Sequence, residues 1–329
     1  MITIAFTLCS NNYLAQAKVL GDSFRKHHPD IEFIIGLVDT FHSSIDYSAF
    51  SGLTILQVSE IDIPEFDDME RKYNIVELNT SVKPFYFTHI FKFLTADKII
   101  YLDPDTQIFS PLEEALNLLD NYNIIITPQN YTPIDDGHSP SDIHLLGTGI
   151  FNLGFIALSH FKKVESFLEW WTKRLVKYGF ADERNNMFFD QVWINLVPVF
   201  FDNYYILKHP AYNMAPSNLH ERQMTKDNMG KWFVNEQYPL RFYHFSGFKF
   251  SNPELMCSYS QRYTFEKRKD VLPLYKSYIH LLAANMIVKL QGIQPYYCQS
   301  PKHFSPPEHK IKRGFNRISR ALKVLTGKA

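Results

Sequence analysis

The sequence predicts an α/β fold in which a mixed, mostly parallel sheet is flanked by helices. Strand-like apolar runs alternate with amphipathic helical stretches along the first half of the chain, and the runs are apolar almost without interruption. Strands of that kind are buried on both faces, as in sheets covered by crossover helices. The length of 329 residues allows one large domain or two modest ones with a buried core.

Each element follows from its own residue pattern. Short β-branched and apolar runs predict strands at residues 2–9, 31–39, 53–59, 96–109, 123–129 and 149–159. Apolar side chains at helical spacing predict helices at residues 14–24, around 82–95, over 160–179 and over 265–293. Residues 133–147 form a polar insertion between two strands, and loops of this length often act as lids.

Composition narrows the classes of function. Hydrophobic residues make up 45% of the chain and charged residues 21%, which is ordinary for a globular protein. A formal net charge of zero gives no nucleic-acid signature, so we expect no nucleic-acid partner. Three cysteines without a CxxC pair argue against a disulfide framework and favour a reducing compartment. The chain has no signal-peptide pattern and no apolar run that would span a bilayer, so we expect a cytoplasmic protein.

Two carboxylates at the end of one predicted strand are the most informative feature. Asp103 and Asp105 directly follow the apolar run 99–102. Open α/β sheets bind their ligands at this edge, and two hard oxygen ligands there suit Mn²⁺ or Mg²⁺ bridging to a diphosphate. Asp and Pro are also common in plain strand-end turns, so the triplet alone leaves both interpretations open. A phosphatase of the haloacid dehalogenase type is disfavoured, because Gln107 stands where that motif has Thr or Val.

Five motifs in order resemble the family 8 glycosyltransferases and their bacterial relatives, which have the GT-A fold. The segments are LCSNNY (8–13), DKIIYLDPDTQIFSPLEE (97–114), GIFNLGFIAL (149–158), FFDQVWIN (188–195) and YHFSGFK (243–249). The resemblance therefore covers residues 1 to about 250. It implies a Rossmann-like sheet, a UDP-sugar donor, Mn²⁺ (or Mg²⁺), and transfer of a hexose with retention of anomeric configuration.

The resemblance also implies roles for particular residues. Asp103 and Asp105 would hold the metal, with His244 as the third ligand. Gln191 would lie under the anomeric carbon of the donor, with Asp190 against the sugar hydroxyls or Gln191 itself. Without the resemblance, His244 reads as a histidine packed in a strand, and Asp190 as a residue that stabilises a helix N-terminus. A Gln amide is a poor nucleophile, so we favour front-face attack, with Gln191 stabilising oxocarbenium-like charge.

The expected substrate contacts fall into a donor set and an acceptor set. For the donor, the nucleoside and diphosphate contacts would be Asn12, Tyr13, Asp39, Lys83 and Lys249. Two departures from the family pattern concern this set: the block after His244 is shortened before Lys249 and lacks Pro-Trp, and Lys83 is the only cation where the family has a sugar-reading Arg. For the acceptor, the expected contacts are Asn152, Asn213 and Arg222.

Two other functions stay open at this point. A sugar nucleotidyltransferase of related fold also uses acidic metal ligands, but it normally has a Gly-rich, cationic loop after the first strand, and residues 8–16 contain neither glycine nor a cation. A catalytically inactive nucleotide-sugar-binding protein is less favoured, since Asp103, Asp105, Gln191 and His244 are all present. The leading hypothesis is transfer to a glycan or lipid-linked acceptor in cell-surface polysaccharide synthesis.

The chain divides into three predicted parts: a transferase domain at 1–255, a helical extension at 256–300, and a linker with a tail helix at 301–329. From residue 309 onward there are seven basic residues and no acidic ones, while apolar residues from Ile311 recur at helical spacing. A basic amphipathic helix is typical of a membrane-surface anchor, although packing on the acidic body is the alternative. We expect residues 309–329 to bind the anionic inner face of the cytoplasmic membrane.

Overall fold

The computed structural model describes residues 1–298, and its centre is a seven-stranded sheet in the order β10-β6-β7-β4-β1-β2-β3. Six strands run parallel, and β7 alone runs antiparallel to both of its neighbours, β4 and β6. This confirms the predicted mixed, mostly parallel sheet. The strands are β1 (Thr3–Cys9), β2 (Glu32–Leu37), β3 (Thr54–Gln57), β4 (Lys98–Leu102), β6 (Ile124–Pro128), β7 (Phe151–Ser159) and β10 (Tyr204–Ile206).

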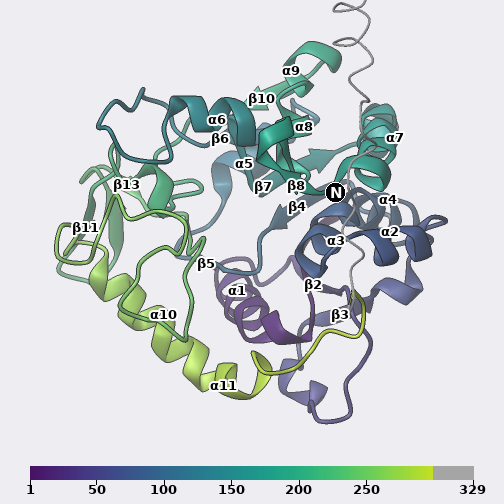
Figure 1. Ribbon diagram of the computed structural model, residues 1–329, viewed down its shortest axis with the longest axis horizontal. Coiled ribbons are helices and arrows are strands. Elements are labelled where there is room, and N and C mark those ends of the chain that lie inside the picture. Colours follow the sequence, from purple (N-terminus) through teal and green to yellow (C-terminus); the bar gives the residue numbers. More distant parts are fainter. Residues whose placement is uncertain (299–329) are drawn as a thin grey trace, which may run out of the picture.

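Helices cover both faces of this sheet, which is why its strands are apolar throughout (Figure 1). In β1, Ala5 and Cys9 face one core, while Ile4, Phe6 and Leu8 face the other. On the first face lie α1 (Leu14–His27), α5 (Glu113–Leu118), α10 (Leu272–Ala284) and α11 (Ile287–Leu290). On the second lie α2 (Phe66–Lys72), α3 (Ile75–Ser81), α4 (Lys83–Phe93) and α7 (Phe161–Tyr178).

Smaller elements surround the sheet. The predicted strand 96–109 is in fact two strands, because the chain turns at Asp103–Asp105 and continues as β5 (Thr106–Ile108), which pairs with β14 (Phe242–His244). The insertion 133–147 contains a short helix that the sequence did not predict, α6 (Asp142–Thr148). The other small elements are β8 (Ala181–Asp182), β9 (Met187–Phe188), α8 (Gln191–Ile194), α9 (Val197–Phe200), β11 (Met224–Lys226), β12 (Trp232–Val234) and β13 (Tyr238–Pro239).

The predicted C-terminal helical extension is present as α10 and α11, which run beside α1 (Figure 1). Their apolar side chains Leu274, Tyr278, Leu282 and Leu290 are buried in the same core as α1. Among the helices of residues 1–298, none is long and apolar enough to cross a membrane. The predicted linker and tail at 301–329 lie outside the described residues.

Candidate active site

A cleft of about 730 Å³ runs along the carboxyl edge of the central sheet. It is lined by the residues that follow β1, β4 and β6. Because β7 runs antiparallel to β4 and β6, its first residues, Asn152 to Gly154, reach the same edge. Ligands of open α/β sheets bind at this edge, and the sequence predicted that Asp103 and Asp105 lie there.

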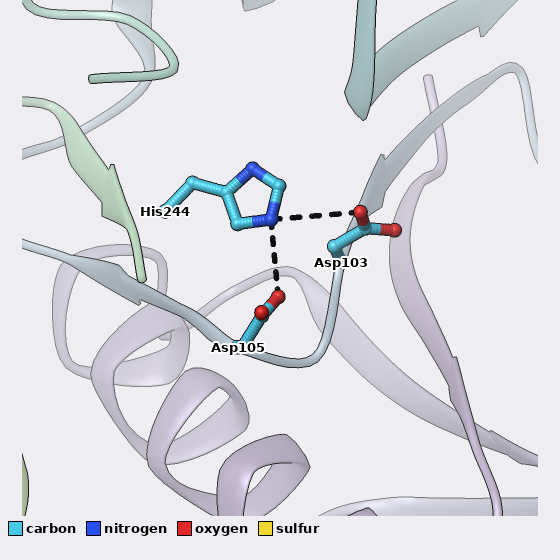
Figure 2. Close-up of side chains that lie close together, drawn as sticks. All are labelled: Asp103, Asp105 and His244. Atoms are coloured by element: carbon cyan, nitrogen blue, oxygen red, sulfur yellow. Dashed lines mark ion pairs between the residues drawn. The ribbon is translucent and has the colours of Figure 1, made fainter. Parts of the chain in front are cut away.

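Asp103, Asp105 and His244 all line this cleft, and their side chains point toward one another (Figure 2). Asp103 follows β4, which lies between β1 and β7 in the sheet. The two aspartates flank the turn between β4 and β5, and His244 ends β14, where it pairs with Thr106 of β5. The His244 Nε2 atom lies 3.1 Å from Asp105 Oδ1 and 3.6 Å from Asp103 Oδ2. One potential ligand atom from each residue lies within 4.8 Å of the others. Two carboxylates and an imidazole are a donor set that fits Mn²⁺ or Mg²⁺.

The charges in this cluster depend on one another. Burial lowers the pKa of His244, but the nearby carboxylates of Asp105 and Asp103 raise it more, so its pKa lies above the usual value. Burial conversely raises the pKa of Asp105, but His244, a backbone hydrogen bond and Lys249 together lower it more, so its pKa lies below the usual value. The cluster therefore favours a positive charge between its carboxylates, which a proton on His244 or a divalent cation would supply.

Two neighbours fix the orientation of the His244 ring. Asn213 is fully buried, and its Nδ2 atom donates to Thr127 Oγ1 (2.9 Å) and to the carbonyl of Asn152 (3.1 Å). Its Oδ1 atom is thus left to accept from His244 Nδ1, at 3.3 Å. With the proton on Nδ1, the Nε2 lone pair is free to face the carboxylates, as a metal-ligating histidine requires.

The second neighbour of the ring is Gly154 in β7. A Cβ atom at this position would lie 2.4 Å from His244 Nδ1 and 2.5 Å from its Cε1 atom, far inside van der Waals contact. The Gly154 carbonyl also accepts the backbone N–H of Asp103 at 3.0 Å. The glycine of the NLGF segment is therefore needed so that β7 can approach both Asp103 and His244.

A buried ion pair lies next to the metal-ligand cluster. Lys83 Nζ, at the start of α4, is 2.5 Å from Asp190 Oδ2, and both side chains are at most 4% exposed. The ammonium group also lies 4.1 Å from the centre of the Tyr101 ring, whose hydroxyl donates to Asp103 Oδ1. Burial raises the pKa of Asp190, and Lys83 offsets only part of this effect. Asp190 is the N-cap residue of α8, although its side chain makes no capping hydrogen bond, so it can interact with the helix dipole as well as with Lys83.

Gln191 lines the cleft beside this pair and is held at both ends of its amide. Its Oε1 atom accepts the backbone N–H of Leu153 at 3.2 Å, and its Nε2 atom donates to the carbonyl of Thr148 at 2.9 Å. These contacts connect it to β7 on one side and to α6 on the other. The amide therefore has a fixed position within the cleft.

The expected donor contacts are only partly brought together. Asn12, Tyr13 and Lys83 line the cleft, and Lys249 Nζ lies 3.3 Å from the Tyr13 hydroxyl. Asp39 does not line it: its carboxylate is buried and accepts three backbone N–H groups, those of Asn11 (3.0 Å), Thr40 (2.9 Å) and Tyr296 (2.9 Å). Asp39 thus connects the ends of β1 and β2 to the C-terminal segment, and its expected contact with the nucleoside stays a prediction.

The expected acceptor contacts divide in the same way. Asn152 lines the cleft, whereas Asn213 lies beneath it and contacts His244. Arg222 is 2% exposed, donates to the carbonyl of Tyr212 at 2.7 Å, and stacks on the Tyr131 ring at 4.6 Å. Both residues were expected in the cleft because their loop is rich in hydrogen-bonding groups. The structure instead places both side chains outside the cleft lining, where Asn213 donates to the carbonyl of Asn152 and Arg222 donates to that of Tyr212.

The sequence also missed several residues that line the cleft. Ser10, Asn79 and Thr80 lie on the β1 side, and α3, which carries two of them, was not predicted. The signal for α3 was present, since Asn74 and Glu77 form a capping box at its start. On the β6 side the missed residues are Gln129, Ser139, Pro140, His144, Leu145, Thr148 and Ser217, and further along the chain Glu183, Ser246 and Tyr259.

Comparison with other chains gives relatives at low identity, and no family model matches the chain. It is 22% identical over 315 residues to YfnD of Bacillus subtilis (strain 168), covering 93% of this chain and 97% of YfnD. It is 24% identical over 254 residues to YfnF of the same organism, covering 74% of this chain and 80% of YfnF. Both relatives are described as uncharacterised, so they suggest no activity.

Among solved structures, the chain is similar to the galactosyltransferase LgtC in complex with donor and acceptor sugar analogs (TM-score 0.49, 18% identity, 86% of this chain and 96% of that chain). It is also similar to the glycosyltransferase GlyE of Streptococcus pneumoniae TIGR4 (TM-score 0.48, 16% identity, 86% of this chain and 63% of that chain). A third similar structure is the bifunctional glycosyltransferase WbbM (TM-score 0.47, 15% identity, 88% of this chain and 52% of that chain). The chain thus spans about half the length of WbbM. These three structures are glycosyltransferases, and the likeness covers most of this chain at low sequence identity.

Proposed function

We propose that the protein is a metal-dependent, retaining glycosyltransferase that moves a hexose from a UDP-sugar to a glycan or lipid-linked acceptor in cell-surface polysaccharide synthesis. The observation that carries the proposal is the cluster of Asp103, Asp105 and His244 in the cleft. A divalent cation held there supplies positive charge that binds a diphosphate and stabilises it as a leaving group. Mn²⁺ is the favoured ion, because it accepts an imidazole nitrogen as a ligand more readily than Mg²⁺ does.

The cleft extends to both sides of this cluster, which supports two substrate sites. On the β1 side, Asn12, Tyr13 and Asn79 offer hydrogen bonds and an aromatic ring, which suit a nucleoside. On the β6 side, Gln129, His144 and the neighbouring hydroxyl groups suit the acceptor sugar. We assign the donor to the first half of the cleft and the acceptor to the second.

Transfer would take place beside Gln191 and the Lys83–Asp190 pair. The amide of Gln191 presents fixed dipoles to the cleft, and such preorganised dipoles stabilise charge that develops in a transition state. A neutral amide does not readily form a glycosyl ester, so we propose attack by the acceptor on the same face from which the diphosphate leaves. Asp190 would accept hydrogen bonds from donor hydroxyls in the cleft, and Lys83 would stabilise its negative charge.

The cleft lining gives less support to a nucleotidyltransferase. Among the described residues that line it, Lys83 is the only lysine or arginine, and it is already paired with Asp190. An enzyme that activates a nucleoside triphosphate normally surrounds it with cations from a flexible loop. We therefore retain the glycosyltransferase as the proposal.

We further propose that the enzyme works at the cytoplasmic face of the membrane, where residues 309–329 bind anionic lipid. This part of the proposal rests on the sequence alone, because the tail lies outside the described residues. Deleting residues 309–329 should release the protein from anionic liposomes at low salt while donor hydrolysis continues. A truncated protein that still sediments with the liposomes would contradict the anchor.

The activity is tested by screening UDP-, GDP- and dTDP-hexoses for Mn²⁺-dependent hydrolysis. Asp103→Asn and Asp105→Asn should abolish turnover without loss of the fold, because each change is isosteric and lies at a strand end. NMR of the transfer product should show retention of anomeric configuration. Full activity in excess EDTA would overturn the metal dependence, and inversion would overturn the proposed mechanism.

A further inference from the structure

One buried arginine outside the cleft holds the loop that forms part of its β6 side. Arg262 is 3% exposed. Its Nε atom lies 2.9 Å from Asp136 Oδ2. Its Nη2 atom has two hydrogens, which are shared among Asp136 Oδ1 (3.2 Å), the His138 carbonyl (2.8 Å) and the Pro140 carbonyl. The Ser260 hydroxyl adds a fifth contact by donating to the Ser139 carbonyl at 3.0 Å. The guanidinium group thus contacts Asp136, His138 and Pro140 of this loop, and Ser260 contacts Ser139.

This loop leads directly into the wall of the cleft. Ser139 and Pro140 line the cleft themselves, and α6 begins two residues later and presents His144 and Thr148 to it. Arg262 itself is not among the lining residues. It therefore shapes the wall only by holding the loop.

The segment that carries Arg262 is also connected to the metal-ligand cluster. Tyr259 lines the cleft, and its hydroxyl donates to Ser246 Oγ at 2.6 Å, two residues after His244. The side chain of Tyr259 packs over Gly247, where a Cβ atom would lie 2.5 Å from its ring. Residues 259–262 thus join the loop at 136–140 to the end of β14.

The chemistry of the guanidinium group explains why an arginine stands here. A polar loop of this length has few apolar contacts to order it, so a few strong hydrogen bonds determine its conformation. The planar fork of arginine reaches one carboxylate and two carbonyls at once, which the single ammonium group of lysine does not. Burying the charge is favourable only while those partners are in place.

We propose that Arg262 is a positioning residue for the acceptor: it holds residues 136–140, and through them α6, in the shape that binds the acceptor sugar. The inference rests on the proposed function, in which the β6 side of the cleft takes the acceptor. Donor hydrolysis and metal binding use the other residues described above. Loss of Arg262 should therefore lower transfer to a sugar far more than hydrolysis by water, which depends on α6 only through the Thr148 carbonyl that accepts from Gln191.

The test compares Arg262→Ala and Arg262→Lys with Arg71→Lys, a control on the exposed Arg71–Asp68 pair of α2. Asp136→Asn is a milder variant that keeps the carbonyl contacts. The first measurement is the partition of a hydrolysed UDP-hexose between water and a panel of methyl hexosides. Both Arg262 variants should lower the transfer-to-hydrolysis ratio about tenfold, while hydrolysis stays within about twofold of wild type. The ratio of Asp136→Asn should lie between that of wild type and that of the Arg262 variants.

The second measurement is amide hydrogen exchange. Residues 133–148 should exchange about tenfold faster in Arg262→Ala, with residues 98–106 and 242–246 unchanged. An unchanged transfer ratio, or equal losses of transfer and hydrolysis, would overturn the positioning role. Unchanged exchange rates in residues 133–148 would contradict the claim that Arg262 orders the loop. A wild type that hydrolyses no UDP-hexose would instead overturn the proposed function and the acceptor role with it.

Discussion

Gly154→Ala tests the metal site without touching any proposed ligand. A Cβ atom at residue 154 would lie 2.4 Å from His244 Nδ1, whereas ordinary contacts begin near 3.4 Å. Because β7 is hydrogen-bonded to both β4 and β6, its backbone is held in place, and the imidazole ring must move away by about 1 Å. Metal ligands tolerate displacements of only about 0.2 Å. The variant should therefore lose His244 as a ligand.

The expected loss is about 10- to 100-fold in Mn²⁺ affinity, or about 1.4 to 2.7 kcal/mol. Titration of the purified protein with Mn²⁺, followed by electron paramagnetic resonance in the presence of UDP, measures it directly. Gly292→Ala is the matched control, because the nearest atom to its added Cβ is 3.7 Å away. If Gly154→Ala bound Mn²⁺ as tightly as wild type while remaining folded, His244 would not be a ligand in this geometry.

Three other predictions concern stability and turnover. His28 accepts the backbone N–H of Leu112 at 2.9 Å, and burial, followed by the charge of His27, lowers its pKa to about 4. As pH falls, the His28 imidazole is therefore protonated in the unfolded chain before it is protonated in the folded protein, so the free energy of unfolding should fall between pH 6.5 and 4. Chemical denaturation should show a less steep fall in His28→Gln. Lys83→Met alone should lower the free energy of unfolding by about 3 to 5 kcal/mol, because it leaves the buried Asp190 carboxylate without its partner. Adding Asp190→Leu should recover much of this loss, and additive losses of the two changes in urea unfolding would contradict the pairing. Gln191→Ala should lower kcat with little change in donor KM, and a change confined to KM would assign it to ground-state binding.

The predicted sheet was largely correct because its strands are apolar on both sides. β1, β2, β4, β6 and β7 all fall within the predicted runs, since strands buried on both faces have few polar residues to obscure the pattern. The direction of β7 was not predictable, because a strand has the same composition in either direction. The short strands β8 to β13, among them the edge strand β10 of the central sheet, were missed, since strands of two or three residues are too short to show a period.

The centre of the candidate site followed from the sequence, but its surroundings did not. Asp103 and Asp105 were recognisable because the strand before them is so apolar that two acids at its end stand out. Arg222 and Asn213 show the limit of this reasoning. A polar side chain looks the same in sequence whether its partner is a substrate or a buried carbonyl, and only the fold distinguishes the two.

The pairing of β5 with β14 has a consequence for how the protein is made. His244 reaches the two aspartates only because Phe242–His244 pairs with Thr106–Ile108, a segment from much earlier in the chain. During synthesis from the N-terminus, Asp103 and Asp105 leave the ribosome long before the strand with His244 does. The proposed metal site is therefore complete only after β14 has been synthesised and has paired with β5.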